Sequence, residues 1–463
     1  MKYISTRGEA PVLGFSDALL AGLARDGGLY LPQEYPQFTA AQIRNLRGKS
    51  YVDIALAVLT PFVNDEIPQA DFERMVREAY GSFRHDAVCP LVQTGSNEYV
   101  LELFHGPTLA FKDVAMQLLA RMMDYVLAQR GERATIVGAT SGDTGGAAIE
   151  AFGGRENTDI FILFPNGRVS PVQQRQMTSS GFSNVHALSI EGNFDDCQNL
   201  VKGMFNDLAF RDSISLSGVN SINWGRIMSQ VVYYFTAALS LGAPDRAVSF
   251  TVPTGNFGDI FAGYVAKKMG LPIDQLIIAT NDNDILARTL ESGAYEMRGV
   301  EQTTSPSMDI QISSNFERLL FEAHDRDASA VRGLMDSMKQ SGGFTISEKP
   351  LSTIRGEFAA GRATVKETAA TIKSVLDTDG YLLDPHSAIA VKVAREKVSG
   401  NAPMVVLATA HPAKFPDAVK AASGVTPELP AWLSDLMDRK ENFTVLHNDL
   451  KIVEDYLRRH SRA

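Results

Sequence analysis

The chain has 463 residues, more than one ordinary hydrophobic core accommodates, so we expect two or three domains. Hydrophobic residues make up 44% and charged residues 21%, which is the profile of a soluble globular protein. The formal net charge of −10 argues against a general nucleic-acid or anionic-membrane surface, but it does not exclude a local positive pocket for a phosphorylated small molecule.

The two cysteines, Cys89 and Cys197, form no CxxC motif and do not staple a chain of this size, which favours a reducing cytoplasmic compartment. The first residues lack the apolar core of a signal peptide. The longest uncharged stretch, 227–244, is interrupted by polar residues and is predicted as a buried helix, not a membrane span. No HExxH motif occurs, and we expect no metal, no membrane partner and no nucleic-acid partner.

Residues 1–92 are predicted to form a mostly helical N-terminal accessory domain. Apolar residues recur at helical spacing in 51–63 and 69–83, and Thr39 is a suitable N-cap for a short helix that precedes them. Residues 84–95 are polar and contain proline and glycine, which predicts a linker.

From Glu98 onward, short apolar segments alternate with helical patterns, which indicates parallel α/β sheets. We expect a first α/β domain at 93–245 and a second at 246–463 that ends in a helical tail. Residues 305–380 look more helical and irregular. The expected strands are 99–104, 134–137, 160–164, 185–190, 247–252, 276–280 and 404–408.

Lys112 stands among apolar residues, after a Gly-Pro-Thr turn and before a helical pattern at 114–129. Near a helix start the dipole disfavours an ammonium, and partial burial shifts the pKa toward the neutral amine as well. A neutral amine is what Schiff-base chemistry requires. The alternative is a lysine whose stem covers Leu109 and Phe111 while its head reaches water, and these residues alone favour that alternative.

Two glycine-rich loops follow predicted strands, at 138–146 and 253–259. Glycines let the backbone approach a ligand closely, and the free amides at the next helix start bind anions. Thr140, Ser141 and Thr144 add hydroxyl groups to the first loop. Each loop alone is equally consistent with an ordinary strand–helix turn, but together they suit two phosphates, one of a cofactor and one of a substrate.

Two further stretches have side chains suited to ligands. Thr409 follows a predicted strand, where open α/β sheets bind ligands, and its hydroxyl suits a neutral ring nitrogen. Asn220, Ser221 and Arg226 lie within a short stretch, and arginine binds phosphate bidentately. A surface turn with a stacked Arg–Trp pair is the alternative there, and His411 in its proline-rich turn is interpreted as structural. The chain has no GxxxxGK[ST] motif, no strand-linked GxGxxG motif and no GxSxG motif.

A lysine after a Gly-Pro-Thr turn, then Ser-Gly-Asp-Thr-Gly, then Gly-Asn-Phe-Gly-Asp resembles the pyridoxal-phosphate enzymes of the tryptophan synthase β-like fold, or fold type II. More narrowly, the chain resembles the threonine synthase family in its longer microbial and fungal type. The resemblance implies two open, mainly parallel-sheet α/β domains with the cofactor between them, plus a helical N-terminal domain. The stretches that carry it are 3–8, 26–32, 105–113, 221–226 and 305–310.

The family pattern also implies roles for individual residues. Lys112 would hold pyridoxal phosphate as a Schiff base and shuttle protons, and Thr409 would face the pyridine nitrogen. Asp143 occupies the place where many relatives carry Asn against the ring's 3-oxygen. The cofactor phosphate would be gripped by the backbone amides of Gly255, Asn256, Phe257, Gly258 and Asp259. The substrate's phosphate and carboxylate would be held by Thr140, Ser141, Thr144, Asn220, Ser221 and Arg226.

The implied activity is that of a carbon–oxygen lyase acting on phosphates, which converts O-phospho-L-homoserine and water to L-threonine and phosphate. Lys112 would take the α-proton while the cofactor stores the electrons. The resemblance also leans toward a monomer. One alternative is a phospholyase with the same fold, which would yield a 2-oxo acid; another is a catalytically inactive metabolite-binding protein that has kept the fold.

Overall fold

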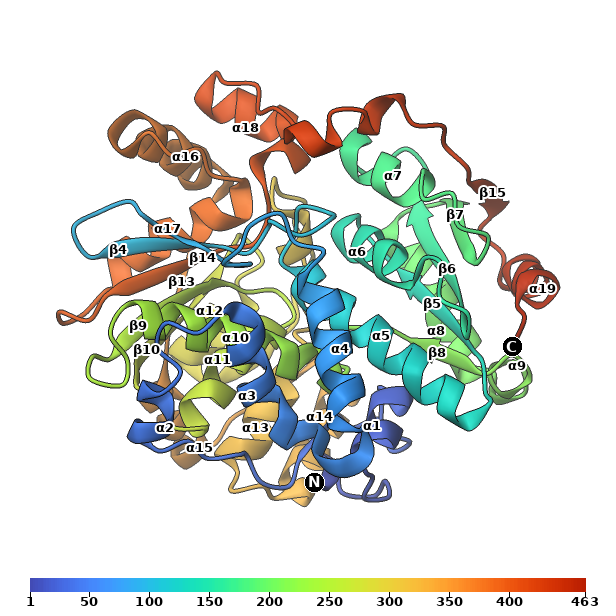
Figure 1. The fold of residues 1–463 in the computed structure, drawn as a ribbon, viewed down its shortest axis with the longest axis horizontal. Helices are drawn as coiled ribbons and strands as arrows, with labels where there is room; N and C mark the ends of the chain where they lie inside the picture. The colour runs from blue at the N-terminus through green and yellow to red at the C-terminus, as the bar shows by residue number, and fades with distance from the viewer.

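Two mainly parallel sheets organise the computed structural model, which describes residues 1–63 and 65–463 (Figure 1). The six-stranded sheet has the order β13-β10-β9-β14-β4-β3, and the five-stranded sheet has the order β15-β7-β6-β5-β8. The predicted α/β class is confirmed. The strands of the first sheet are β3 (Leu91–Gln93), β4 (Glu98–Glu102), β9 (Val248–Pro253), β10 (Ile273–Thr280), β13 (Phe358–Arg362) and β14 (Met404–Ala408). Those of the second are β5 (Ala134–Ala139), β6 (Thr158–Pro165), β7 (Val185–Glu191), β8 (Leu216–Gly218) and β15 (Thr444–His447).

Helices cover these sheets and form the N-terminal segment (Figure 1). The helices up to the middle of the chain are α1 (Phe15–Ala21), α2 (Ala40–Arg44), α3 (Tyr51–Val63), α4 (Gln69–Tyr80), α5 (Lys112–Arg130), α6 (Asp143–Phe152), α7 (Pro171–Thr178), α8 (Phe194–Asn206), α9 (Leu208–Ser213) and α10 (Trp224–Ser240). The later helices are α11 (Gly258–Lys268), α12 (Ile285–Ser292), α13 (Phe316–Ala323), α14 (Ala328–Ser341), α15 (Glu348–Glu357), α16 (Val365–Asp379), α17 (Pro385–Lys397), α18 (Pro416–Ser423) and α19 (Leu450–His460). Two small hairpin-like pairs complete the fold, β1 (Tyr3–Ser5) with β2 (Tyr30–Pro32) and β11 (Ala294–Glu296) with β12 (Gly343–Thr345).

The N-terminal segment shares its hydrophobic core with the rest of the chain. Helix α3 packs against α10, and α4 packs against α5. Tyr3 is fully buried and donates a hydrogen bond to the Phe62 carbonyl at 2.7 Å. Thr39 caps α2 through a capping box with Gln42, as predicted from its side chain. Because its apolar face is shared, this segment is not an independent globule.

Sheet membership departs from chain order at two places. Strand β4, predicted as the start of the first α/β domain, instead pairs in parallel with β14 in the six-stranded sheet, with Tyr99 opposite Val405. Its neighbour β3 lies inside the predicted linker 84–95, which is therefore partly strand. At the other end, β15 pairs with β7 of the five-stranded sheet. Both corrections arise from pairing between segments far apart in sequence, which local patterns do not encode.

The C-terminal tail joins the two halves of the molecule. In Figure 1 it runs from α18 across the top of the view to β15 and α19. On the way, Glu441 accepts hydrogen bonds from Gln174 at 3.1 Å and Thr178 at 2.8 Å on α7. Helix α10 contains residues 227–240 of the uncharged stretch predicted as a helix at 227–244, and it is largely buried. No helix among the described residues is long and apolar enough to cross a membrane.

Candidate active site

The predicted site residues lie on loops that follow strands and in the first turns of the helices that these loops enter. The loop after β5 enters α6, the loop after β9 enters α11, and Thr409 follows β14. The segment 103–111 leaves β4 in the six-stranded sheet and enters α5, which packs against α6 on the five-stranded side. The ligand-binding ends of both sheets are thereby brought together, which is where open α/β folds bind ligands.

Helix α5 begins at Lys112, as the turn chemistry predicts, and Asp113 holds the turn before it. The Asp113 carboxylate accepts hydrogen bonds from the Thr108 backbone N–H at 2.8 Å and the Thr108 hydroxyl at 2.6 Å. Gly106 is required beside it, because a Cβ there would lie 2.5 Å from the Asp113 Cβ. Burial raises the pKa of Asp113 to about 6, despite these hydrogen bonds.

Backbone pairing places Thr409 beside the lysine turn. The Phe111 N–H donates to the Thr409 carbonyl at 2.8 Å, and the His411 N–H donates to the Leu109 carbonyl at 3.0 Å. Thr409 is buried, at 6% exposure. The two segments, one preceding α5 and one following β14, therefore form one rigid wall of the site.

Lys112 is buried in a cluster of charged groups. Its Nζ lies 3.6 Å from Asp143 Oδ2 and 4.8 Å from the centre of the Phe111 ring. Burial lowers the Lys112 pKa, and the positive charges of Arg226 and Lys414 lower it further, while Asp143 opposes them. The lowered pKa agrees with the sequence-based expectation and favours the neutral amine.

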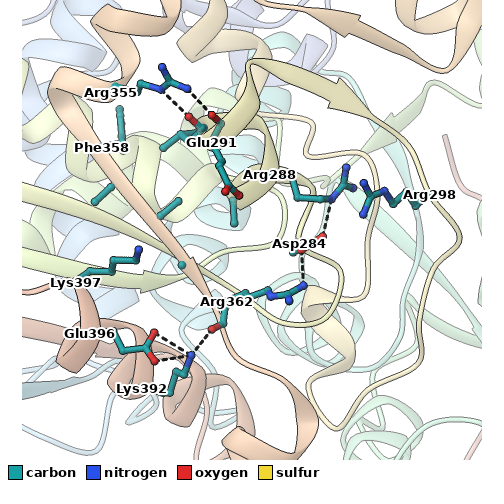
Figure 2. Close-up of a pocket in the computed structure, with 15 residues that line it drawn as sticks. Asp284, Arg288, Glu291, Arg298, Arg355, Phe358, Arg362, Lys392, Glu396 and Lys397 are labelled. Carbon is teal, nitrogen blue, oxygen red and sulfur yellow. Dashed lines mark hydrogen bonds and ion pairs between the residues drawn. The ribbon is translucent and has the colours of Figure 1, made fainter.

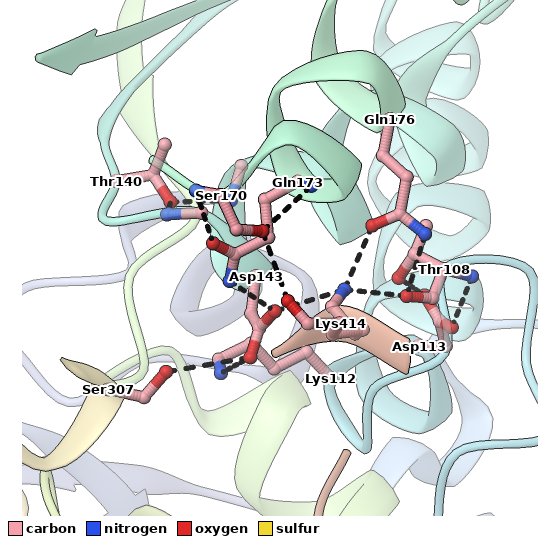
Figure 3. Close-up of polar contacts among 12 residues, drawn as sticks. Thr108, Lys112, Asp113, Thr140, Asp143, Ser170, Gln173, Gln176, Ser307 and Lys414 are labelled. Atoms are coloured by element: carbon pink, nitrogen blue, oxygen red, sulfur yellow. Dashed lines mark hydrogen bonds and ion pairs between the residues drawn. The ribbon is translucent and has the colours of Figure 1, made fainter. Parts of the chain in front are cut away.

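Asp143 lies between two lysines (Figure 3). Its Oδ1 is 3.0 Å from Lys414 Nζ and accepts a hydrogen bond from Gln173 at 2.9 Å, and its Oδ2 lies 3.5 Å from the Ser307 hydroxyl. Burial alone would raise the Asp143 pKa, but Lys414 and then Lys112 outweigh burial and hold it well below its usual range. Asp143 is therefore a carboxylate, which accepts hydrogen bonds and cannot donate one.

The loop at 140–145 is shaped by its own hydroxyl. Thr140 Oγ1 accepts hydrogen bonds from the Gly142 and Gly145 N–H groups, each at 2.9 Å. Gly142 has φ of +140°, and a Cβ there would meet the Gln173 amide at 2.3 Å, so only glycine fits. The Ser141, Asp143 and Thr144 N–H groups donate no hydrogen bond to any described residue, which leaves them available to an anion.

The loop at 255–259 is an open cradle of backbone amides. None of these N–H groups donates a hydrogen bond within residues 1–63 and 65–463. By contrast, carbonyl groups of the loop accept hydrogen bonds from residues 313 and 315. Ser313 Oγ donates to the Gly255 carbonyl at 2.6 Å, and the Asn315 N–H donates to the Asn256 carbonyl at 3.1 Å. A Cβ on Gly255 would approach the Ser307 carbonyl oxygen to 2.8 Å. These features fit the phosphate of pyridoxal phosphate.

Asp259, at the second position of α11, carries a buried carboxyl group. Its Oδ1 accepts hydrogen bonds from the Tyr233 and Tyr234 hydroxyls, and its Oδ2 is buried without a hydrogen-bond partner among the described residues. Burial raises the Asp259 pKa to about 7, so much of this carboxyl is neutral at physiological pH. A neutral acid beside an anion cradle repels a phosphate less than a carboxylate does.

Arg226 is a buried cation without a carboxylate partner. It is 2% exposed, donates to the Val219 carbonyl at 3.1 Å, and leaves its Nε without a hydrogen-bond partner in the described part of the chain. Burial lowers its pKa to about 10, so it stays charged at neutral pH. Ser221 lies beside the loop at 255–259, since its carbonyl oxygen would be 3.7 Å from a Cβ on Gly258, whereas Asn220 is exposed. A buried guanidinium of this kind suits an anionic ligand.

Sequence reasoning missed several residues around Asp143, namely Lys414, Gln173, Gln176 and Ser307. Lys414 could have been found by the argument used for Lys112, since it too is a lysine among apolar residues after a strand. Gln173 and Gln176 have no such signal, because they face Asp143 and Lys414 only through the packing of α7 on α6. His411 caps the short helix at Pro412–Lys414 through its Nδ1, as its structural interpretation predicts.

A hollow of about 760 Å³ lies elsewhere, between α12, β13 and α17 (Figure 2). Many of its cations are bound by the chain itself. Arg288 and Arg362 both contact Asp284, at 2.7 and 2.9 Å, and Lys392 contacts Glu396 at 2.9 Å. It contains none of the residues predicted for catalysis, and the candidate site is the cluster around Lys112.

Comparisons with known proteins identify the family of the chain. Residues 90–410 match the family model of pyridoxal-phosphate dependent enzymes, residues 2–80 match the threonine synthase N terminus, and residues 387–457 match the threonine synthase C-terminal model. The fold and site thus define a pyridoxal-phosphate-dependent enzyme of fold type II. In the described residues, no group of three or more His, Cys, Asp and Glu is arranged to hold a metal ion.

The relatives narrow the class. Threonine synthase of Pseudomonas aeruginosa is 55% identical to this chain, and the match covers 99% of this chain and 98% of the relative. Threonine synthase of Saccharomyces cerevisiae is 42% identical, and the match covers 98% of this chain and 95% of the relative. The crystal structure of pyridoxal-phosphate-bound threonine synthase from Brucella melitensis is 89% identical, covers 100% of both chains and superposes with a TM-score of 0.98. The chain belongs to the threonine synthase family, whose members are enzymes of the lyase class.

Proposed function

We propose that this enzyme converts O-phospho-L-homoserine and water to L-threonine and phosphate, the last step of threonine biosynthesis. The observation that carries the proposal is Arg226, a buried guanidinium with no carboxylate partner, in a cluster that already has a separate cradle for the cofactor phosphate. In the loop at 140–145, the Ser141 and Thr144 amides and hydroxyls make no hydrogen bond within the described residues and suit a carboxylate. A small amino acid with a phosphate at the far end matches both.

The substrate contacts are proposed as two groups. Arg226 and its neighbouring turn receive one anion, and the loop after β5 receives the other. Receiving the phosphate's charge is what makes phosphate a good leaving group. The proposed substrate residues are Thr140, Ser141, Thr144, Asn220, Ser221 and Arg226.

The proposed cofactor contacts use the other groups of the cluster around Lys112. Bound pyridoxal phosphate would supply a covalent link to the substrate amine and an electron sink. The amides at 255–259 would bind its phosphate, Thr409 would face its ring nitrogen, and Asp143 would lie near its 3-oxygen. Lys112 would hold the cofactor in the resting enzyme and, as a neutral amine, accept and return the protons of the substrate carbons.

Product identification tests the proposal. The holoenzyme is given O-phospho-L-homoserine, and phosphate, threonine and 2-oxobutyrate are measured. We expect phosphate matched by threonine. Phosphate matched by 2-oxobutyrate would make the protein a phospholyase, and a protein that takes up no pyridoxal phosphate would be a metabolite-binding relative; either result overturns the proposal.

We propose further that the enzyme is a monomer of the cytoplasm without nucleic-acid or membrane partners. The net charge of −10 supports the absence of nucleic-acid and membrane partners, and the two buried free cysteines support the cytoplasm. The monomer is proposed from the family resemblance. As domains we propose 1–92, 93–245 and 246–463, with β4 and β15 exchanged between the sheets. Sedimentation equilibrium of the full chain tests the monomer.

A further inference from the structure

Two buried lysines share the carboxylate of Asp143, but their surroundings differ. Lys414 Nζ lies 3.0 Å from Oδ1, within hydrogen-bond distance. Lys112 Nζ lies 3.6 Å from Oδ2, beyond that distance, and donates no hydrogen bond to any described residue. One lysine is therefore fixed by its partners, and the other is left able to react.

Three oxygen atoms surround the Lys414 ammonium nitrogen (Figure 3). Its Nζ donates hydrogen bonds to the Thr108 carbonyl at 2.6 Å and to Gln176 Oε1 at 2.9 Å, and it forms an ion pair with Asp143. An ammonium has three donors and no lone pair. The Lys414 side chain is 0% exposed, and two hydrogen bonds and one ion pair hold its Nζ in place, so it is poorly placed to act as a nucleophile.

These contacts connect three separate parts of the site. Lys414 follows β14, Thr108 belongs to the turn before Lys112, and Gln176 is on α7 of the five-stranded half. The Lys414 carbonyl also accepts a hydrogen bond from Ser170, the N-cap of α7, at 3.1 Å. Lys414 thus fixes Asp143 relative to the turn that presents Lys112.

The charges that face Lys112 come from several elements. Asp143 on α6 favours its ammonium form, while Arg226 on α10 and Lys414 favour the neutral amine. Asp259 on α11 is the remaining acidic group close enough for the charge of Lys112 to lower its pKa. Without Lys414, the Asp143 charge would act on Lys112 with only Arg226 to offset it, and the ammonium form would gain.

We propose that Lys414 is a positioning residue of the active site, which binds the Asp143 carboxylate and thereby leaves Lys112 to react as a neutral amine. The proposal rests on the proposed role of Lys112 as the cofactor lysine. It does not depend on which product the enzyme forms, so a readout that precedes turnover separates the two proposals.

The test measures how fast the full-length protein, prepared without cofactor, captures pyridoxal phosphate between pH 6 and 10. In this step the Lys112 amine adds to the cofactor aldehyde and water leaves, and the absorbance of the product reports the rate. Lys414→Met should move the pH midpoint of the rate upward by about one unit, so that capture below the midpoint slows about tenfold. Lys420→Met, at an exposed lysine on α18, is the matched control and should leave the midpoint unchanged.

A second variant gives the opposite sign. Asp143→Asn should move the midpoint downward, and the double variant Lys414→Met with Asp143→Asn should lie between the two single variants. A purely structural role predicts slower capture with no shift of the midpoint. An unchanged pH midpoint in Lys414→Met would overturn the proposal. If Lys414→Met does not fold, a midpoint that fails to fall in Asp143→Asn would overturn it.

Discussion

The Gly106→Ala substitution probes the turn that presents Lys112. The added Cβ would lie 2.5 Å from Asp113 Cβ and 2.5 Å from Asp113 Oδ2, about 1 Å closer than an ordinary contact. Asp113 Cβ is fixed to the first turn of α5, so the carboxylate must move away from Thr108. It would then lose hydrogen bonds of 2.8 and 2.6 Å at a position with 0% exposure, where no water replaces them.

The expected destabilisation follows from these contacts. Overpacking costs about 1–3 kcal/mol, and each of the two hydrogen bonds to a charged group is worth about 1.5–3 kcal/mol, so we expect a loss of about 4–9 kcal/mol. Urea unfolding followed by the fluorescence of Trp224 and Trp432 measures it. Capture of pyridoxal phosphate should slow as well, because the turn carries Lys112.

Gly333→Ala is the matched control. Gly333 lies inside α14, and a Cβ there would meet nothing within 4 Å. We expect it to stabilise the protein by up to about 1 kcal/mol, since alanine favours helix. If Gly106→Ala unfolds within about 1 kcal/mol of the parent, the steric reasoning about the turn is refuted.

Three other predictions concern neighbouring groups. The Asp113 pKa is raised from 3.8 to about 6, so the stabilising contribution of Asp113 is fully present below pH 4 and is lost as pH rises through 6. The difference in unfolding free energy between the parent and Asp113→Asn should therefore fall by about 3 kcal/mol from pH 4 to 7. A difference that stays constant with pH would contradict this prediction. Arg226→Met should lower kcat/KM at least about 100-fold. It should not lower the unfolding midpoint of the substrate-free protein, because the substitution removes a buried cation that has no carboxylate partner among the described residues. Unchanged kcat/KM would exclude Arg226 from substrate binding. Gly255→Ala should weaken pyridoxal phosphate binding at least about tenfold, measured by equilibrium dialysis, because its Cβ would press on the Ser307 carbonyl at 2.8 Å, and parent-like affinity would show that the cradle lies elsewhere.

Local signals account for much of what the sequence predicts. The Gly-Pro-Thr turn and the helical pattern after it predict the start of α5 near Lys112, and the helical periodicity at 51–63 matches α3. By contrast, β13 has the sequence Phe-Ala-Ala-Gly-Arg, which has little strand propensity, and it is a strand because it pairs with β10. The predicted sheet assignment of β4 failed for the same reason, since its partner β14 lies near the other end of the chain.

The site residues also divide into those that local sequence patterns predict and those that depend on the fold. Glycine loops after strands can be recognised from sequence, because each loop carries its own turn chemistry. The ion pair of Asp143 with Lys414 could not be recognised from sequence, because it joins residues from the two halves of the molecule. The charge state of Asp143 depends on that pairing, so it too required the structure.

The central claim is that Lys112, and not the more deeply buried Lys414, carries the cofactor. Reduction of the holoenzyme with borohydride makes the bond between the lysine amine and the cofactor permanent, and peptide mapping by mass spectrometry then locates it. We predict the phosphopyridoxyl group on the peptide that contains Lys112. The group on the Lys414 peptide, or on neither, would contradict the account of the site.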